Sequence, residues 1–317
     1  MHYLVTGGAG FIGSNMVNTL LRQGHQVTVY DNLSTGMPEF LADAQKSAGF
    51  RLVEGDTLDL TSLTHELQGV DFVFHFAANA DVRHGTEHTR RDLEQNTIAT
   101  YNVLEAMRLN DVNRIAFSST GSIYGEPEMI PTPENAPFPT QTSFYGASKL
   151  AGEGLISAYC EGFGFQGYIF RFVSILGEHY THGHVLDFYR QLQTNPNALH
   201  LLGDGHQRKS YLYVQDCIAA IQTVIEKAQD KINIYNLGTD EACEIKDSAR
   251  WIAEHLGLNP TVTYAGGTRG WIGDSPFILL DCQKVRSLGW TPKLTIKEAV
   301  LKTVDYLHAN AWVLERR

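Results

Sequence analysis

A glycine-rich turn between two β-prone segments constrains the fold of this chain more than any other feature. A short apolar run over residues 3–6 leads into Gly7-Gly-Ala-Gly-Phe-Ile-Gly13, and residues 14–23 then show the apolar periodicity of an amphipathic helix. Residues 26–30 form a second β-prone run, which ends at Asp31. A strand, a glycine turn, a helix and a parallel strand within about thirty residues are typical of a Rossmann-type domain. We therefore predict an α/β fold.

The glycines of this turn fit a dinucleotide-binding pattern. They satisfy both Gly8-x-Gly10-x-x-Gly13 and Gly7-x-x-Gly10-x-x-Gly13. Glycine allows a tight turn, lets a pyrophosphate approach the backbone, and lets the helix pack closely on the strand. We expect the turn to hold a dinucleotide through Gly7, Gly10, Phe11, Ile12 and Gly13.

Asp31 bears on which dinucleotide binds. A carboxylate at the end of the second strand can accept hydrogen bonds from the adenosine ribose and would repel a 2′-phosphate. Residues 32–36 supply no arginine to offset that repulsion. We therefore expect NAD rather than NADP, with Asn32, Ser34 and Gly36 beside the adenosine; capping of a helix is the alternative role for Asp31.

Further β-prone and helical segments continue the alternation. Strands are predicted over residues 50–54, 71–76, 114–117 and 168–173, and helices over residues 92–109 and 185–193. Together they predict a doubly wound parallel sheet with helices on both faces, plus a smaller mixed α/β substrate lobe. We expect residues 1–173 to form the NAD-binding domain, with returns near 211–238 and 276–281, and residues 174–210 and 239–317 to form the substrate lobe.

Small and polar residues follow several of these strands. The carboxyl edge of an open α/β sheet is where ligands bind. Asp56 could bond an adenine amino group or cap the next helix, and the hydroxyls of residues 118–120 could serve a ligand or only stabilise a turn. The candidate cofactor residues at this edge are Asp56, Thr57, Phe76, Ala77, Ala78, Ser118 and Phe172.

Tyr145 and Lys149, four residues apart, would share one face of a helix. A free phenol has a pKa of about 10, which is too high for a base near neutrality. A fixed positive charge beside the phenol favours the phenolate and lowers that pKa. The pair is thus a candidate proton-transfer group, and the alternative is a surface helix with an amphipathic tyrosine.

Composition and charge disfavour several other classes of function. Acidic residues outnumber basic ones by 35 to 25, a formal net charge of −10, so binding to nucleic-acid phosphates is not expected. No apolar run has membrane-spanning length, and the start of the chain suggests no signal peptide. The four cysteines are scattered, which predicts reduced thiols in the cytoplasm. No metal site is expected, because His182-x-His184 has no partner at ligand spacing.

Taken together, these motifs resemble the extended short-chain dehydrogenase/reductase family, and within it the nucleotide-sugar epimerases that act on UDP-glucose and UDP-galactose. The resemblance covers nearly the whole chain. It is carried by the glycine turn, Asp31, His75-Phe-Ala-Ala78, Ser118-Ser-Thr-Gly-Ser-Ile-Tyr-Gly125, Tyr145-x-x-x-Lys149, and shorter matches at residues 202–205, 213–216, 235–238 and 288–290.

The resemblance implies roles for four residues. Thr120 would hydrogen-bond the substrate hydroxyl and Tyr145 would take its proton. Lys149 would bond the nicotinamide ribose and keep Tyr145 anionic, and Asn96 would stabilise the nicotinamide side of the pocket. The implied reaction is 4-epimerisation: transient oxidation at C4 to a 4-keto sugar, followed by return of the hydride to the opposite face.

One departure bears on the reaction. The dehydratases of this family carry an Asp-Glu pair immediately after the Ser/Thr of the triad, and this chain has Gly121 and Ser122 there. Elimination of the C6 hydroxyl then lacks its general acid. We therefore expect an epimerase and not a 4,6-dehydratase.

Three further departures lie on the substrate side. Ser174 stands where many relatives have Asn, and Lys209 stands where an arginine is usual. The family's Arg-Pro-Gly-Asp reads Trp271-Ile272-Gly273-Asp274, so either Arg269 replaces the missing arginine or Trp271 stacks on a base or sugar. The implied substrate-binding residues are Thr120, Ser122, Tyr145, Ser174, His184, Val185, Lys209, Tyr211, Arg269, Trp271 and Asp274.

The identity of the substrate stays open at this stage. The nucleotide could be UDP, GDP or CDP, the reaction could be a 2-epimerisation or the decarboxylation of UDP-glucuronate, and a non-catalytic NAD sensor is a candidate from another class. The family also implies a homodimer joined through helices around residues 89–109 and 148–162.

Overall fold

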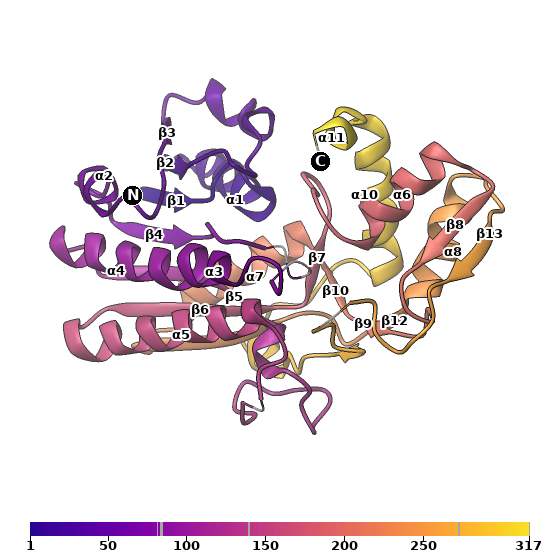
Figure 1. The fold of residues 1–317 in the computed structure, drawn as a ribbon. Helices are drawn as coiled ribbons and strands as arrows, with labels where there is room; N and C mark the ends of the chain where they lie inside the picture. The colour runs from indigo at the N-terminus through magenta and orange to yellow at the C-terminus, as the bar shows by residue number, and fades with distance from the viewer. Residues whose placement is uncertain (81, 83–84, 139, 272, 317) are drawn as a thin grey trace. The chain divides into compact units, whose positions relative to one another are not determined.

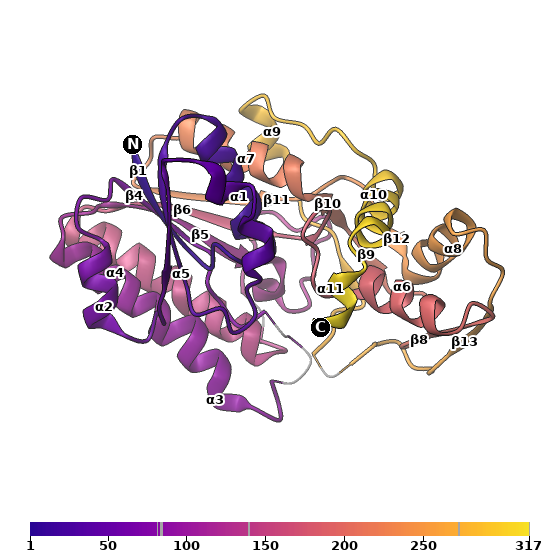
Figure 2. The same cartoon turned by 90° about the horizontal axis from the view of Figure 1, so that it is seen from above.

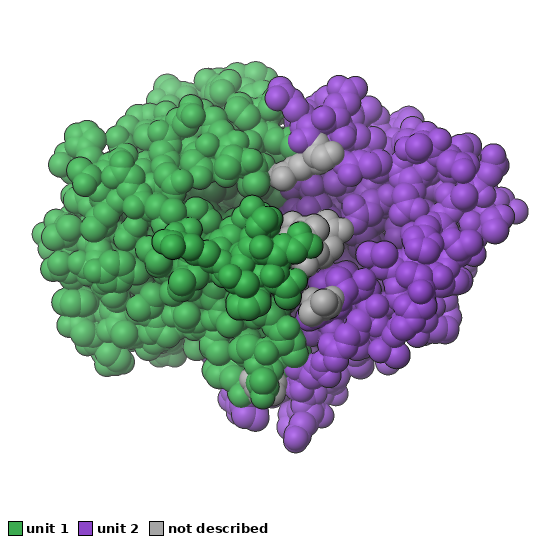
Figure 3. All heavy atoms as spheres, in the orientation of Figure 1, with its two compact units in different colours: residues 1–125, 138–171, 221–235 green, residues 126–137, 172–220, 236–317 purple. Residues whose placement is uncertain are grey.

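The computed structural model describes residues 1–80, 82, 85–138, 140–271 and 273–316. Contacts divide the chain into two compact units, coloured separately in Figure 3. Unit 1 contains Met1–Gly125, Phe138–Arg171 and Ile221–Tyr235, and unit 2 contains Glu126–Pro137, Phe172–Ala220 and Asn236–Arg317. Of the expected returns to the first domain, residues 221–235 are in unit 1 and residues 276–281 are in unit 2. The assignment of NAD and substrate lobes remains a prediction.

Unit 1 is built around a seven-stranded sheet with the strand order β3-β2-β1-β4-β5-β6-β11. Figure 1 labels the first six of these strands, and Figure 2 labels β11. β1 pairs in parallel with both β2 and β4, so the order reverses between β1 and β4. Ligands of doubly wound sheets bind at such a reversal. The predicted fold class is confirmed. The strands are β1 His2–Thr6, β2 Gln26–Asp31, β3 Phe50–Glu54, β4 Phe72–His75, β5 Arg114–Thr120, β6 Gln166–Phe172 and β11 Ile232–Leu237.

Helices alternate with these strands along the chain. Figures 1 and 2 show α4 and α5 side by side on one face of the sheet. The helical segments up to α5, together with α7, are α1 Phe11–Arg22, η1 Pro38–Leu41, η2 Ala44–Lys46, α2 Leu60–Glu66, α3 Thr89–Asp92, η3 Leu93–Ile98, α4 Ala99–Leu109, η4 Gly121–Tyr124, α5 Phe144–Phe163 and α7 Val214–Lys227.

Two elements differ from the sequence-based expectation. The single helix expected over residues 92–109 begins at Thr89 and contains a π-helical stretch, η3, in which Asn96 is buried. Such wide turns occur frequently at functional sites. The strand expected over residues 114–117 continues to Thr120. Ser118 and Ser119 are therefore strand residues, which gives their side chains fixed and alternating directions.

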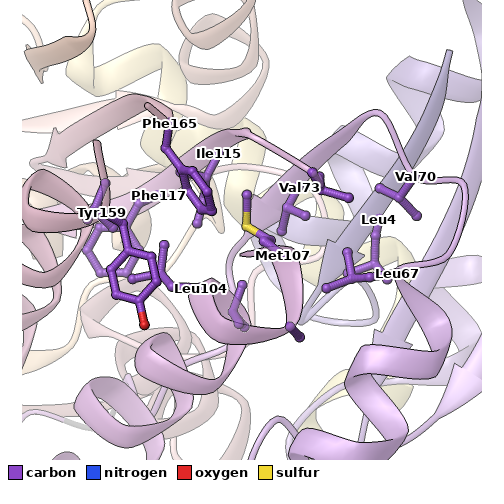
Figure 4. Packing of buried hydrophobic residues seen from close by; sticks show 14 of the residues in the cluster. Leu4, Leu67, Val70, Val73, Leu104, Met107, Ile115, Phe117, Tyr159 and Phe165 are labelled. Atoms are coloured by element: carbon purple, nitrogen blue, oxygen red, sulfur yellow. The ribbon is translucent and has the colours of Figure 1, made fainter. Parts of the chain in front are cut away.

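A buried apolar cluster holds α2, α4 and α5 against the sheet (Figure 4). Because β4 and β5 are apolar and buried, their ends are held in fixed positions at the sheet edge. The labelled members of the cluster are Leu4, Leu67, Val70, Val73, Leu104, Met107, Ile115, Phe117, Tyr159 and Phe165. Burying each large side chain contributes about 1.5–3 kcal/mol before the entropy of ordering is counted.

Unit 2 is a smaller mixed α/β assembly. Its short sheets join β7 with β10, β9 with β12 and β14, and β8 with β13. Among the described residues, no helix of the chain combines the length and the apolar character needed to cross a membrane. The elements are β7 Ser174–Leu176, α6 His184–Thr194, β8 Ala198–Leu201, β9 Arg208–Lys209, β10 Tyr211–Tyr213, β12 Cys243–Glu244, α8 Ile245–His255, β13 Thr261–Tyr264, β14 Phe277–Ile278, α9 Gln283–Ser287, α10 Ile296–Ala309 and α11 Trp312–Glu315.

Candidate active site

The glycine turn after β1 is packed too closely at Gly7 and Gly13 to accept a side chain at either position. A Cβ on Gly7 would lie 2.6 Å from the backbone nitrogen of Ala77, and a Cβ on Gly13 would lie 2.1 Å from the carbonyl oxygen of Gly7. Gly7 also has φ +68°, which favours glycine. α1 begins directly afterwards with Gly10 as its N-cap, and the sequence of its first turn has no acidic side chain. An uncapped helix N-terminus of this kind suits a pyrophosphate, so the turn fits a dinucleotide.

The carboxylate of Asp31 is fixed by two loop N–H groups. The N–H of Ala9 donates to Oδ2 and the N–H of Leu33 donates to Oδ1, each at 2.9 Å. A Cβ on Gly36 would lie 2.8 Å from Oδ1, so glycine is needed beside this group. Burial raises the pKa of Asp31 and the two N–H donors lower it. Both oxygens bond a loop, which does not support the helix-cap alternative.

Asp56 belongs to the same end of the sheet. Its Oδ1 accepts from the N–H of Leu58 at 2.9 Å, and its Oδ2 accepts from the Asn32 amide at 3.1 Å. The cap of α2 is Asp59, which accepts from the N–H of Ser62 at 3.0 Å. The helix-cap alternative for Asp56 is therefore wrong. A contact with adenine stays a prediction.

Helix α5 begins close to the turn that follows β5, and Ser143 is its N-cap. The Ser143 hydroxyl accepts from the N–H of Gly146 at 3.0 Å. A Cβ on Gly146 would lie 2.9 Å from the carbonyl oxygen of Ser122, so the first turn of α5 packs tightly on the turn after β5. This packing brings Tyr145 toward Thr120.

The three predicted catalytic residues, Thr120, Tyr145 and Lys149, come together in unit 1, and we call them the catalytic trio. Thr120 is the last residue of β5, and its hydroxyl is hydrogen-bonded to the Tyr145 phenol. Lys149 follows one helical turn after Tyr145, donates to the carbonyl of Ser118 at 2.8 Å, and lies 4.8 Å from the centroid of the Phe117 ring.

The electrostatics of the trio differ from the expectation in one respect. Burial raises the pKa of Tyr145 to about 12; the hydrogen bond from Thr120 lowers it and the charge of Asp92 raises it. Burial lowers the pKa of Lys149 to about 7, against the charges of Asp92 and Glu153. A lowered Tyr145 pKa was expected from the lysine, but the pKa is raised, and burial is the largest cause. The phenol is therefore neutral near pH 7.

Thr120 also stabilises the turn that follows it. Its Oγ1 accepts from the N–H of Ser122 at 3.1 Å and lies 3.2 Å from the hydroxyl oxygen of Ser122. The turn-forming alternative for these hydroxyls is thus correct for Thr120, without excluding its contact with Tyr145. Gly121, between them, is buried and offers no side chain to a ligand.

Asn96 connects the π-helical stretch to α5. Its amide nitrogen donates to the Ser148 hydroxyl at 2.9 Å and to Asp92 at 3.2 Å, and its oxygen accepts from the N–H of Asn79 at 2.8 Å. The Ser148 hydroxyl donates in turn to the carbonyl of Tyr145 at 2.8 Å. Sequence reasoning did not assign Asn79, Asp92 or Ser148 to the site. The available signals were the position of Asn79 just after β4 and that of Ser148 beside Lys149.

Three predicted substrate residues of unit 2, Asp274, Trp271 and Arg269, lie near Lys209. Its ammonium donates to Asp274 at 2.5 Å and to the carbonyl of Ser275, and Trp271 lies over it at 5.8 Å. Burial lowers the pKa of Lys209, while Asp274 raises it. Ile272, within the same motif, is outside the described residues.

Arg269 lies in the same cluster. Its guanidinium donates to the carbonyl of Asp274 at 2.7 Å and pairs with Glu126. These contacts use Nη1 and Nη2 of the guanidinium. Because a guanidinium has five N–H donors, other N–H groups of Arg269 can bond a ligand.

His184 begins α6 close to β10. Its ring centroid is 4.7 Å from that of Tyr211, and its Nε2 lies 2.8 Å from the Ser248 hydroxyl. Val185 is fully buried, and Ser174 on β7 is exposed opposite Tyr211 in the strand register. Within the described ranges, no group of three or more His, Cys, Asp or Glu side chains could hold a metal ion.

The predicted residues thus fall into two sets. Unit 2 contains Phe172, Ser174, His184, Val185, Lys209, Tyr211, Arg269, Trp271 and Asp274. Unit 1 contains Gly7, Gly10, Phe11, Ile12, Gly13, Asp31, Asn32, Ser34, Gly36, Asp56, Thr57, Phe76, Ala77, Ala78, Asn96, Ser118, Thr120, Ser122, Tyr145 and Lys149.

Comparison with known proteins agrees with this geometry. The sequence profile described as the NAD dependent epimerase/dehydratase family matches residues 3–238. The chain belongs to this family. A UDP-glucose 4-epimerase of Corynebacterium glutamicum is 32% identical over 93% of this chain and 92% of its own length.

Solved structures of family members have the same fold. A UDP-galactose 4-epimerase superposes with a TM-score of 0.88 at 37% identity, covering 98% of this chain and all of that one. The UDP-glucose 4-epimerase of Thermus thermophilus, solved with NAD, gives 0.86 at 33% identity over 97% and 99% of the two chains. The predictions of an epimerase-family enzyme, of isomerase activity and of NAD as cofactor are confirmed.

Proposed function

We propose that this chain is a nucleotide-sugar 4-epimerase that interconverts UDP-glucose and UDP-galactose. The observation that carries the proposal is the hydrogen bond between Thr120 and Tyr145, with Lys149 one helical turn away. This arrangement lies in a chain about one third identical to proteins named UDP-glucose 4-epimerase.

In the proposed mechanism the catalytic trio handles the proton of the sugar 4-hydroxyl. Thr120 hydrogen-bonds that oxygen and Tyr145 accepts its proton, in a site where Lys149 supplies the positive charge that favours the phenolate. NAD, when bound by the glycine turn and by Asp31, supplies the hydride acceptor for C4 and additional positive charge. Inversion at C4 would need the hydride to come back to the opposite face of the 4-keto sugar, and Tyr145 would return the proton to its 4-oxygen.

Dehydration is not proposed, because no side chain can protonate the C6 hydroxyl at the expected place. Gly121 has no side chain, and Ser122 is engaged with Thr120 at 3.2 Å. A hydroxyl is also a weak acid compared with the carboxyl group that elimination requires.

The diphosphate of the substrate is proposed to meet Lys209 and Arg269. The two cations flank Asp274, which bonds the lysine ammonium through its carboxylate and the arginine guanidinium through its carbonyl. Arg269 therefore takes the role of the missing family arginine in this proposal. Trp271, over Lys209, is the alternative contact for the sugar or the base.

A cytoplasmic homodimer is proposed as the working form. All four cysteines are buried free thiols, which suits a reducing compartment. Exposed apolar side chains lie along the helices expected at the interface, and burying them in a dimer would remove apolar surface from water. They are Leu93, Ile98, Tyr101 and Leu109. Light scattering after size exclusion tests this, with Tyr101→Glu expected to give a monomer.

One experiment separates the candidate functions. The protein is incubated with NAD and, in turn, UDP-, GDP- and CDP-hexoses and UDP-glucuronate, and the products are followed by proton NMR. UDP-glucose formed from UDP-galactose supports the proposal. A 2-epimer, a pentose product, or an epimer from another nucleotide would reassign the substrate. No product from any substrate would favour the sensor.

A further inference from the structure

Arg171 is the largest fully buried side chain among the described residues, and its charge is matched by a buried carboxylate. It extends from β6 to Glu153 on α5, and the two side chains are 2% and 5% exposed. Nη2 donates to Oε2 at 2.8 Å and Nε donates to Oε1 at 3.1 Å. This two-point geometry fixes both the distance and the orientation of the pair.

Aromatic groups enclose the guanidinium. Nη1 donates to the Tyr124 hydroxyl at 2.7 Å, and the carbon of the guanidinium lies 5.0 Å from the Tyr124 ring centroid and 5.2 Å from that of Phe138. Arg171 is therefore held on three sides within unit 1. The carboxylate of Glu153 cannot shift without breaking contacts made by a rigid group.

Glu153 links the two elements that carry the catalytic trio. It lies one helical turn after Lys149, on the same face of α5. Its Oε1 also accepts from the hydroxyl of Ser119 on β5. Ser119 stands between Ser118, whose carbonyl receives the Lys149 ammonium at 2.8 Å, and Thr120. The carboxylate thus fixes the register of α5 on β5 at the level of the site.

Stability alone does not account for a pair of this kind. Two charges lose their hydration on burial, and well-packed apolar residues of similar size often stabilise a core as well or better. The surrounding unit 1 core is already apolar and extensive. Because Glu153 adjoins the residues that carry the catalytic trio, the location of the pair suggests a role other than stability.

We propose that Glu153 and Arg171 are positioning residues, which set the separation of the Thr120 hydroxyl from the Tyr145 phenol and keep the Lys149 ammonium protonated. The expected effect of the pair on turnover rests on the proposed epimerase function, whereas its expected effects on stability and on Lys149 do not. The other titratable groups beside the trio are Asp92 from α3, whose charge acts on both Lys149 and Tyr145, and His75 from β4, whose pKa the charge of Lys149 lowers. Loss of the Glu153 charge removes one of the two carboxylates that favour the ammonium.

The test uses the double variant Glu153→Met/Arg171→Met, which replaces the pair by apolar side chains of similar length. Each single variant leaves one buried charge unmatched and should lower the urea midpoint, whereas the double variant should regain most of it. We expect kcat of the double variant to stay at least about tenfold low, because small displacements at a reacting centre are costly. The basic limb of its pH profile should move to lower pH. A double variant with wild-type kcat and pH profile would overturn the proposal.

Two further measurements keep the test decisive. Arg171→Lys retains the charge but loses the two-point contact, so it should fold and still lose turnover; unchanged kcat would contradict positioning. Titration of ¹³C-labelled lysine by NMR, without substrate, should show Lys149 titrating at lower pH in the double variant, with Lys149→Arg providing the assignment. An unchanged titration would overturn the electrostatic part. If the wild-type protein were inactive, only the proposed function would be contradicted, because the titration of Lys149 does not depend on turnover.

The matched control is Arg51→Met/Glu66→Met. This ion pair joins β3 and α2, also in unit 1, and involves partly exposed side chains remote from α5 in the sequence. Its removal should leave kcat and the Lys149 titration at wild-type values. An equal loss of turnover in the control would show that the effect at Glu153 and Arg171 is not specific, and would contradict the proposal.

Discussion

The ammonium nitrogen of Lys149 lies 2.8 Å from the carbonyl oxygen of Ser118, so the lysine is bonded to the strand that ends at Thr120. This contact ties the two halves of the catalytic trio together, since Tyr145 and Lys149 share α5 whereas Thr120 belongs to β5. It also explains why the lysine can be buried at all. The carbonyl replaces part of the hydration that the ammonium loses.

Replacing Lys149 by methionine should abolish most turnover without unfolding the protein. The variant retains the length of the side chain but loses the charge that favours the Tyr145 phenolate. We expect kcat to fall by about 10²–10⁴-fold, the usual contribution of a proton-transfer group. The measurement is the rate of UDP-galactose conversion by NMR, with far-UV circular dichroism as the control for folding. A loss of less than twofold would remove Lys149 from the mechanism.

The glycine turn gives a prediction with an internal control. Gly13→Ala places a Cβ 2.1 Å from the carbonyl oxygen of Gly7, so the turn must move and NAD affinity should fall at least about tenfold. Gly154→Ala adds the same methyl group to α5, where no atom lies within 4 Å. That variant should bind NAD normally and gain about 0.5–1 kcal/mol of helix stability. Fluorescence titration with NAD and urea unfolding measure both; equal NAD affinity in the two variants would contradict the role of the turn.

Because His75 is buried in its neutral form, the protein should lose stability in mild acid. Its ring is 1% exposed, with Nδ1 2.7 Å from the Thr6 hydroxyl and Nε2 3.0 Å from that of Thr100. Burial and the charge of Lys149 lower its pKa to about 3, against about 6.5 in the unfolded chain. The unfolded state therefore binds more protons between these two values, and the free energy of unfolding falls as the pH drops from 6.5 toward 3.

At pH 5 the contribution of His75 to this loss is about 2 kcal/mol, from 1.36 kcal/mol per pKa unit. Urea unfolding at pH 7.5, 6 and 5 measures it. Burial also lowers the pKa of His184 to about 3, so His184 adds to the wild-type loss. The comparison with His75→Asn isolates His75: the variant, although less stable at pH 7.5, should lose less on acidification. Parallel curves would contradict a neutral buried His75.

Sequence patterns were sufficient for the parts of this molecule that depend on local chemistry. The order of strands and helices and the glycine turn follow from hydrophobic periodicity and from residues with special backbone needs. The grouping of Thr120, Tyr145 and Lys149 depended on resemblance to a family, since residues 25 positions apart carry no pairwise signal of contact. The structure now shows Thr120 and Tyr145 hydrogen-bonded.

Other features could not be predicted because they arise from tertiary packing. The π-helical stretch around Asn96, the buried pair of Glu153 with Arg171 and the neutral His75 have no local pattern of their own. The direction of the Tyr145 pKa depended on the balance of burial against charge, which requires coordinates. On the substrate side, Lys209 was identified, but its bond to Asp274 was not.

Comparing two variants can show whether Arg269 or Trp271 makes the main contact with the nucleotide sugar in unit 2. Arg269→Ala should raise KM for the nucleotide sugar about tenfold with little change in kcat, because a diphosphate contact is made equally in the ground and transition states. Trp271→Ala should have the smaller effect if the arginine takes the role proposed here. Initial-rate kinetics with UDP-galactose decide between them. The reverse order of effects would assign the contact to Trp271.

The central claim is that the hydrogen on the sugar C4 leaves as a hydride and returns to the opposite face of the same carbon. UDP-galactose deuterated at C4, incubated with the protein and NAD in ordinary water, tests this most directly. We predict UDP-glucose that retains its deuterium at C4, with conversion abolished in Tyr145→Phe. Exchange of that deuterium with water, or full turnover in Tyr145→Phe, would contradict the claim.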